Sequence, residues 1–278
     1  MKKIAAALVA GCLFWPLAAT AQRAAPAPWQ GAWGHPPTAY NSLPPTVRAD
    51  GRQAAPLYAP LPPYRDVTVR QVVRLSGPAR VIRLRFTNEF DERPLHIASA
   101  HIALAGEDGA ILPGTDHVIT FAGKGSTDIQ PGAPLLGDTL TWSLPAFAKL
   151  AISIHYPSDT VPPAHTIFTM QAWQAPGDRT SDTLLPSATP ARTGLHVSQI
   201  DIRPERKGST LVTFGDSITE GVVSTPGAFR GYPDRLAERL QANPATRGWT
   251  VVNAGIGSNR LLHDTPSTNA LSRFDRDV

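Results

Sequence analysis

The sequence predicts two architectures in succession, an antiparallel β-sandwich and then the beginning of a doubly wound α/β sheet. Between residues 64 and 202, short segments alternate apolar and polar residues and are separated by turns rich in glycine and proline. No stretch of this region has a helical period. After a polar linker at 204–208 the order becomes strand, helix, strand, helix, which is typical of a parallel sheet with crossover helices.

Composition agrees with a folded, loop-rich protein. The chain has 278 residues, which is enough for one large domain or two ordinary ones. Hydrophobic residues make up 42% and charged residues 17%, as in globular rather than disordered chains. The 28 prolines and 22 glycines favour a β architecture over a helical bundle.

The first 21 residues have the pattern of a secretory signal. Two lysines are followed by an apolar run and by a small-x-small cleavage site that ends at Ala21. A lipoprotein signal is the alternative, because Val9-Ala10-Gly11 precedes Cys12, but the apolar run continues past this cysteine. The run is short for a membrane span and is interrupted by Pro16. We therefore expect cleavage after Ala21 and a periplasmic or secreted protein.

Cleavage would change both the charge and the cysteine content. It would remove Cys12, the one cysteine of the sequence, so the mature chain would have no disulfide. It would also remove two lysines, which lowers the formal net charge from +4 to +2. Since no basic stripe with interleaved aromatic residues is present, no nucleic-acid partner is predicted.

The region before residue 64 is predicted to be extended coil and edge structure, because proline removes backbone donors. Trp29 and Trp33 lie here and could bind sugar faces or cover the edge of the core. Strands over 67–71 and 82–87 flank the turn Ser76-Gly77-Pro78, which predicts an antiparallel hairpin. Further strands are expected over 96–104, 118–121, 139–142, 150–156, 166–173 and 195–202. The histidines of this region lack metal-ligand spacing, so no metal site is predicted.

The α/β part is predicted element by element. An apolar strand covers 210–214, and Pro233 opens a helix that ends at Asn243-Pro244. A second strand covers 250–252, and a second helix begins near 267–269. The apolar face of that helix is expected to carry Ala270, Leu271, Phe274 and Val278.

The segment Thr-Phe-Gly-Asp-Ser-Ile-Thr-Glu-Gly, residues 213–221, has the features of a nucleophile turn. It follows the first of these strands directly, so the Ser217 hydroxyl would emerge at the carboxyl end of a strand, where open α/β sheets bind ligands. It differs from the Gly-x-Ser-x-Gly elbow because Thr219 replaces the second glycine. The alternative is an ordinary polar turn. Asp216 is expected to hold the turn rather than to take part in chemistry.

This segment resembles the first block of the GDSL or SGNH hydrolase family, Gly-Asp-Ser-[hydrophobic]-Thr-x-Gly. The loop 253–260, Asn-Ala-Gly-Ile-Gly-Ser-Asn-Arg, resembles the family's second block, although a flexible glycine-rich loop is the alternative. The resemblance implies a flavodoxin-like, three-layer hydrolase domain with Ser217 as the nucleophile. It also implies an oxyanion hole formed by the backbone N–H of Ser217 and that of Gly257 or Ser258. The chain resembles exported, two-domain members in which a jelly-roll-like β domain precedes the hydrolase domain.

Two blocks of the family do not occur after Ser217. These are Gly-x-Asn-Asp, which supplies an oxyanion asparagine, and Asp-x-x-His, which supplies the base. His263 lies in Leu-His-Asp and comes too early to replace the second. We therefore expect the front portion of a longer hydrolase, with a signal at 1–21, a sandwich over 27–205 and an incomplete hydrolase domain over 206–278.

The predicted function is an exported carboxylic-ester hydrolase that needs no metal or cofactor. Its substrate would be a small acyl ester or an acetylated carbohydrate. Because a serine without its base is a weak nucleophile, this chain is expected to have little or no activity. The alternative is a sandwich that binds carbohydrate or a surface and carries a vestigial hydrolase segment.

Overall fold

The computed structural model describes residues 27–38, 61–165, 169–265 and 267–278. The expected signal at 1–21 lies outside the described residues, as do the first three positions of the strand expected over 166–173. None of the helices in these described ranges is long and apolar enough to cross a membrane.

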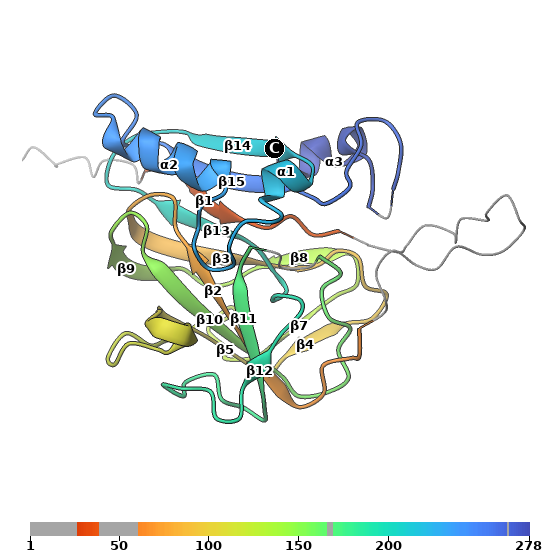
Figure 1. The fold of residues 1–278 in the computed structure, drawn as a ribbon. Coiled ribbons are helices and arrows are strands. Elements are labelled where there is room, and N and C mark those ends of the chain that lie inside the picture. Colours follow the sequence, from red (N-terminus) through yellow and green to blue (C-terminus); the bar gives the residue numbers. More distant parts are fainter. Residues whose placement is uncertain (1–26, 39–60, 166–168, 266) are drawn as a thin grey trace, which may run out of the picture.

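Two antiparallel sheets form the predicted sandwich (Figure 1). The five-stranded sheet has the order β1-β13-β3-β8, and β9 also pairs with β3. Its strands are β1 (Gln30–Gly34), β3 (Ala79–Asn88), β8 (Ala133–Leu136), β9 (Leu140–Leu144) and β13 (Val197–Arg203). The six-stranded sheet has the order β12-β11-β2-β10-β5-β6. Its strands are β2 (Val67–Arg74), β5 (Ser99–Leu104), β6 (His117–Val118), β10 (Lys149–Tyr156), β11 (Gln171–Pro176) and β12 (Thr189–Pro190).

The core lies between the two sheets. Leu150, Ile152 and Ile154 of β10 are fully buried and belong to one apolar cluster with Ile82 and Phe86 of β3. The period-two alternation of these strands directs one set of side chains to the core, as the sequence predicts. A small pair, β4 (Leu95–Ile97) with β7 (Thr127–Ile129), and the 3-10 turn η1 (Glu107–Gly109) complete this part.

The predicted hairpin is wrong. The strands β2 and β3 form where they were expected, but they belong to different sheets and do not pair. The turn at Ser76 instead leads the chain from one sheet to the other. Ser76 Oγ donates to the carbonyl of Ala32 and accepts from the N–H of Val251, both at 2.8–2.9 Å. These contacts anchor the turn to β1 and to the α/β segment, which alternation and turn residues alone cannot predict.

The α/β segment follows the sandwich in the predicted order. Strands β14 (Thr210–Gly215) and β15 (Thr250–Gly255) pair in parallel, with Gly215 opposite Gly255. The helices are α1 (Ser217–Glu220), α2 (Tyr232–Ala242) and α3 (Ala270–Asp277). Pro233 stands in the first turn of α2, and Asn243 caps its end. A three-layer α/β domain is not evident in the described residues, which contain this one pair of parallel strands.

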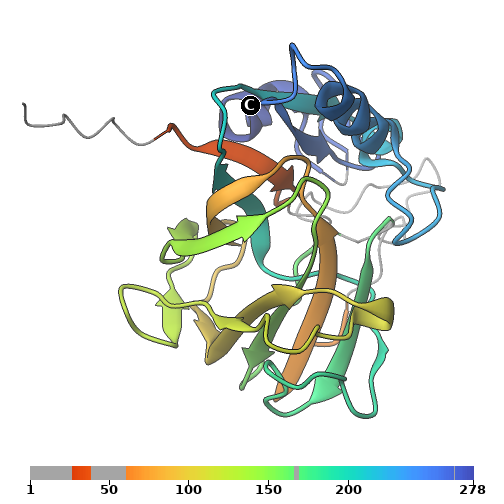
Figure 2. The same ribbon diagram turned by 90° about the vertical axis from the view of Figure 1, so that its left-hand side faces the viewer.

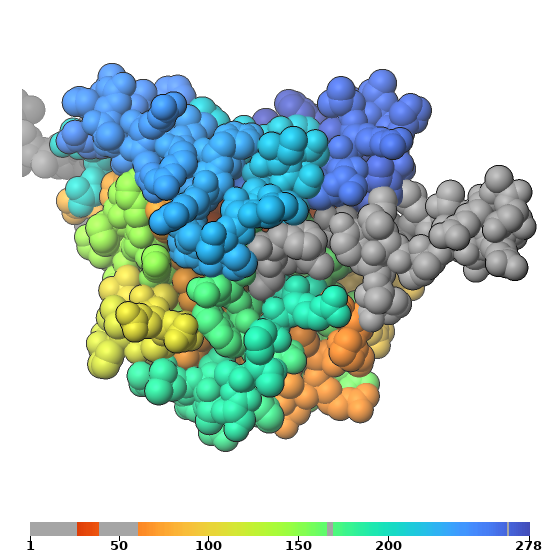
Figure 3. All heavy atoms as spheres, in the orientation of Figure 1, coloured from red at the N-terminus to blue at the C-terminus, as the bar shows by residue number. Residues whose placement is uncertain are grey.

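The α/β segment covers one end of the sandwich, and β1 lies between the two (Figures 1 and 2). A Cβ atom added to Gly31 or Gly34 of β1 would overlap the side chain of Val252, so these glycines allow β1 to approach β15 closely. Arg74 of β2 forms ion pairs with Asp234 and Glu238 of α2, at 3.2 and 3.1 Å. In the space-filling view the atoms of the segment rest on those of the sandwich (Figure 3). The two parts therefore share an interface.

Candidate functional site

Ser217 is the first residue of α1, at the carboxyl end of β14. Asp216 caps this single turn, because its Oδ1 accepts the N–H of Ile218 at 2.9 Å. The turn ends at Gly221, which has a φ of 97°, and the N–H groups of Gly221 and Val222 both donate to the carbonyl of Ser217. Asp216 thus holds the turn, as expected, and the half-buried Ser217 is part of a hydrogen-bonded backbone.

Two glycines let α1 pack against the strand ends. A Cβ atom on Gly215 would overlap the side chain of Thr219, and one on Gly255 would overlap the backbone of Glu220. Asn253 adds a polar link, since its Nδ2 donates to the carbonyls of Thr219 and Glu220 at 3.1 and 3.3 Å. The α1 turn, which begins at Ser217, is therefore fixed to both parallel strands.

The loop after β15 contains both oxyanion candidates, and they differ in environment. Gly257 is buried, and its N–H interacts with the carboxyl group of Glu220. Ser258 is exposed and has a φ of 60°, in the left-handed region that favours glycine. Because Gly257 is buried whereas Ser258 is exposed, Ser258 is the candidate that we carry forward as an oxyanion donor.

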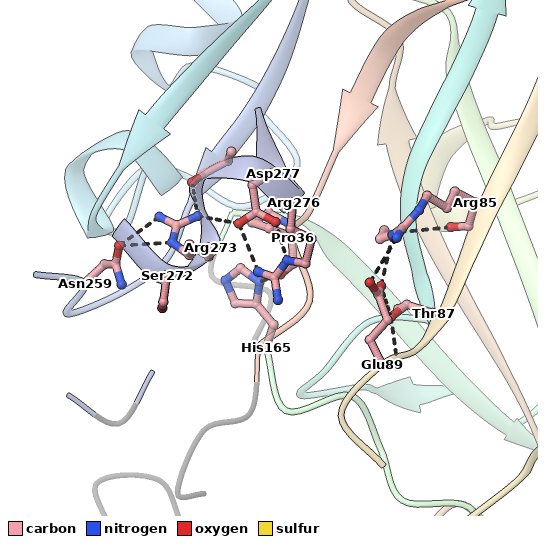
Figure 4. Close-up of polar contacts among 12 residues, drawn as sticks. Pro36, Arg85, Thr87, Glu89, His165, Asn259, Ser272, Arg273, Arg276 and Asp277 are labelled. Carbon is pink, nitrogen blue, oxygen red and sulfur yellow. Dashed lines mark hydrogen bonds and ion pairs between the residues drawn. The ribbon is translucent and has the colours of Figure 1, made fainter. Parts of the chain in front are cut away.

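The sequence analysis missed Arg273, which links the parts of this site. Its side chain is 1% exposed. It donates to the carbonyls of Gly215 and Ala254, the last or next-to-last residues of the two parallel strands, each at 2.9 Å. It also donates to Asn259 Oδ1 at 2.9 and 3.1 Å and to Asp277 Oδ2 at 2.7 Å (Figure 4). One guanidinium thus joins the ends of β14 and β15, the loop after β15 and α3.

The apolar residues expected along one face of α3 are mostly exposed. Ala270 is buried, but Leu271, Phe274 and Val278 are 70%, 48% and 57% exposed. Arg273 takes the buried position because the carbonyl groups at the strand ends need donors, and a guanidinium supplies several in one plane. Its charge also lies 4.1 Å from the ring centroid of Phe214. A run of apolar residues at helical spacing carries no signal for such a role.

Behind α1 lies a cluster of three ionisable groups, the buried Glu220 and His165 and the half-buried His35. Glu220 Oε1 lies 3.3 Å from His165 Nε2, and the rings of His165 and His35 stack with centroids 3.8 Å apart. Burial raises the pKa of Glu220 to about 7, against the opposing effects of His35 and the Gly257 N–H. Burial also lowers the pKa of His165 to about 4 and that of His35 to about 3. Of these two histidines, His165 was expected to be an ordinary strand or turn residue, and nothing was predicted for His35.

Within the described residues, no histidine is hydrogen-bonded to Ser217 Oγ. His263 lies in an exposed part of the loop before α3. No group of three or more metal-ligating side chains gathers in the described ranges either.

The two tryptophans that could have bound sugar make contacts within the chain. The Trp29 ring lies 4.2 Å from the Arg83 guanidinium and 4.6 Å from that of Arg203. Trp33 is partly buried against the sandwich core and lies near His35. Such contacts within the chain are typical of residues that cover the edge of a core, which was the alternative to sugar binding for these two tryptophans.

No family model matches this chain, and no curated protein shows significant similarity to it. The function of this chain is therefore inferred from the motifs at 213–221 and 253–260 and from the geometry around Ser217.

Proposed function

We propose that this chain carries the nucleophile and the oxyanion loop of a serine hydrolase of GDSL type, which acts on carboxylic esters. The observation that supports the proposal is the register of the parallel pair, in which Gly215 lies opposite Gly255. The Ser217 turn and the loop that contains Ser258 consequently leave the sheet at the same edge. A hydroxyl and free backbone N–H groups at one edge are the minimum that acyl transfer requires.

In the proposed reaction, Ser217 Oγ attacks the ester carbonyl and the alcohol leaves, which gives an acyl-enzyme that water then hydrolyses. The N–H groups of Ser217 and Ser258 would bind the negatively charged oxygen of the intermediate. The hydroxyl proton must pass to a base, and no histidine in the described residues is bonded to Ser217. We therefore expect both acylation of Ser217 and turnover to be slow. A small acyl ester or an acetylated carbohydrate remains the proposed substrate, with no metal or cofactor, in the periplasm or outside the cell.

The test is covalent labelling, because it needs a reactive serine but not a complete turnover. The purified chain would be treated with a fluorophosphonate probe, and the labelled residue identified by peptide mass spectrometry. We expect slow labelling at Ser217 that is lost in Ser217→Ala and kept in Ser224→Ala, a matched serine seven residues later. Hydrolysis of p-nitrophenyl acetate would be slow in the same samples. No labelling at Ser217, or equal labelling in both variants, would refute the proposal.

The alternative function, carbohydrate or surface binding by the sandwich, receives no specific support from these contacts. Its motivation came from Trp29 and Trp33, and both side chains are engaged within the chain. The esterase proposal is therefore the one that we develop.

A further inference from the structure

Glu220 stands at the end of the α1 turn, and its side chain points away from solvent toward the sandwich. Its side chain is 5% exposed and that of His165 is 2% exposed. Glu220 belongs to the α/β segment, whereas His165 lies nine residues beyond β10, and His35 directly follows β1. A carboxyl group of the nucleophile turn thus meets two imidazole rings from another part of the fold.

The hydrogen-bond partner of His165 Nδ1 fixes the tautomer of this ring. His165 Nδ1 lies 2.8 Å from the carbonyl oxygen of Pro36, which can accept but not donate. Nδ1 therefore carries a hydrogen, and in the neutral ring Nε2 is an acceptor. Glu220 Oε1, 3.3 Å from Nε2, is also an acceptor when it is ionised. Since two acceptors repel each other, the contact is favourable when one proton lies between them.

We propose that Glu220 and His165 form a positioning pair that docks the α1 turn, and with it Ser217, on the β-sandwich by sharing one proton. In the neutral arrangement the Glu220 carboxyl donates its O–H to His165 Nε2. Loss of that proton leaves a buried carboxylate facing a nitrogen lone pair, which weakens docking. The proposal concerns the docking of α1, so it holds whether or not Ser217 proves to be a nucleophile.

Other charged groups also act on this pair. Below the pair, a cavity of about 80 Å³ reaches Glu220 and His35 and can admit the few water molecules that carry the proton away. Arg273, Arg276 and Asp277 of α3 also act on His165, with opposite signs (Figure 4). The groups that face the pair or line the cavity are His35, Arg74, Arg230, Asp234, Arg273, Arg276 and Asp277.

The direction of the pH effect follows from the two states of Glu220. Its pKa is about 7 when α1 is docked, against an ordinary value of 4.5 when α1 opens to solvent. The contribution of Glu220 to the equilibrium constant for docking is therefore largest below pH 4.5. The constant falls about tenfold per pH unit from pH 4.5 to pH 7 and does not change further above pH 7. The buried histidines have the opposite dependence. A comparison with Glu220→Gln therefore isolates the carboxyl group, because an amide donates to Nε2 at every pH.

The experiment measures amide hydrogen exchange of Gly221 and Val222 between pH 5 and pH 8 by NMR. The N–H groups of these residues donate to the carbonyl of Ser217, so their protection reports the α1 turn. We expect the ratio of wild-type to Glu220→Gln protection to fall about tenfold per pH unit up to pH 7 and then to level off. Glu238→Gln, a carboxylate that binds Arg74 across the same interface, is the control and should show the wild-type profile.

A second measurement on the wild-type protein keeps the proposal testable if a variant fails to fold. The side-chain carboxyl carbon of Glu220 should titrate with a midpoint near 7 in the ¹³C spectrum, and the rings of His165 and His35 should stay neutral through that range. A Glu220 midpoint near 4.5 would overturn the proposal. A protection ratio that does not change with pH would overturn it as well.

Discussion

Arg273 Nη2 lies 2.9 Å from the carbonyl oxygen of Gly215, two residues before Ser217, although α3 is far from β14 in the sequence. The same guanidinium reaches the carbonyl of Ala254, at the corresponding end of β15. The ends of the two parallel strands are therefore joined through a single buried side chain.

Replacing Arg273 should consequently destabilise the α/β segment. In Arg273→Met the strand-end carbonyls lose their donor, and Asp277 becomes a buried carboxylate that keeps Arg276 as its cationic partner. We expect a loss of roughly 3–5 kcal/mol in the free energy of unfolding, as for other buried ion pairs that lose one partner. Urea denaturation, monitored by circular dichroism, measures this difference in the free energy of unfolding between Arg273→Met and the wild type. Arg239→Met on the exposed face of α2 is the control, and an equal loss there would contradict the role of Arg273.

Gly255→Ala tests the close approach between β15 and α1. The new methyl group would overlap the backbone of Glu220, which a rotamer change cannot relieve. We expect a loss of roughly 1–3 kcal/mol from overpacking, together with weaker labelling of Ser217. Gly125→Ala is a matched control, because a Cβ atom there meets open space and its φ is not positive. If both variants unfold at the same urea concentration as the wild type, α1 does not pack as described.

The sandwich could be predicted from the sequence because alternation reports which side chains face a core. The strand partners could not, and β2 and β3 show why. Their residues fit a hairpin, but Ser76 is bound to β1 and β15, which are distant in the sequence. The short strands β7, β8 and β12 were also missed, since two to four residues carry too little periodicity.

In the candidate site, the turn at Ser217 could be predicted from the sequence, but the buried side chains that contact this turn could not. Ser217 and Asp216 belong to a local motif, and Asp216 caps the turn as expected. Arg273, His165 and Glu220 act through contacts made by tertiary packing, for which a single sequence has no local pattern. Arg273 is buried although it is a charged residue outside the apolar face expected for this helix.

Ser258→Gly should stabilise the oxyanion loop. Ser258 has a φ of 60°, which is unfavourable for residues with a Cβ atom, and its side chain is exposed. Relief of this strain is partly offset by the greater chain entropy of glycine in the unfolded state, so we expect a gain of roughly 0.5 kcal/mol. Ser258→Val should have the opposite effect, because β-branched residues avoid this region. Thermal denaturation of both variants decides the matter, and a lower midpoint for Ser258→Gly than for Ser258→Val would contradict it.

The buried histidines predict how stability depends on pH. Burial lowers the pKa of His196 to about 4, from an ordinary value of 6.5, as it does for His165. Between pH 6.5 and pH 4 the unfolded chain therefore binds protons that the folded protein excludes. Stability should rise with pH over that window and gain nothing further from these groups above pH 6.5.

His196→Gln isolates the contribution of one such group. It removes one titrating ring, so the slope of unfolding free energy against pH should decrease by roughly 1.4 kcal/mol per pH unit between pH 4 and pH 6.5. His196 Nδ1 lies 3.0 Å from the Tyr156 hydroxyl, and the glutamine amide can keep a hydrogen bond there. Urea denaturation of the wild type and of His196→Gln at a series of pH values gives the two slopes. Equal slopes in His196→Gln and the wild type would mean that His196 is protonated in the folded protein, against the direction that its burial implies.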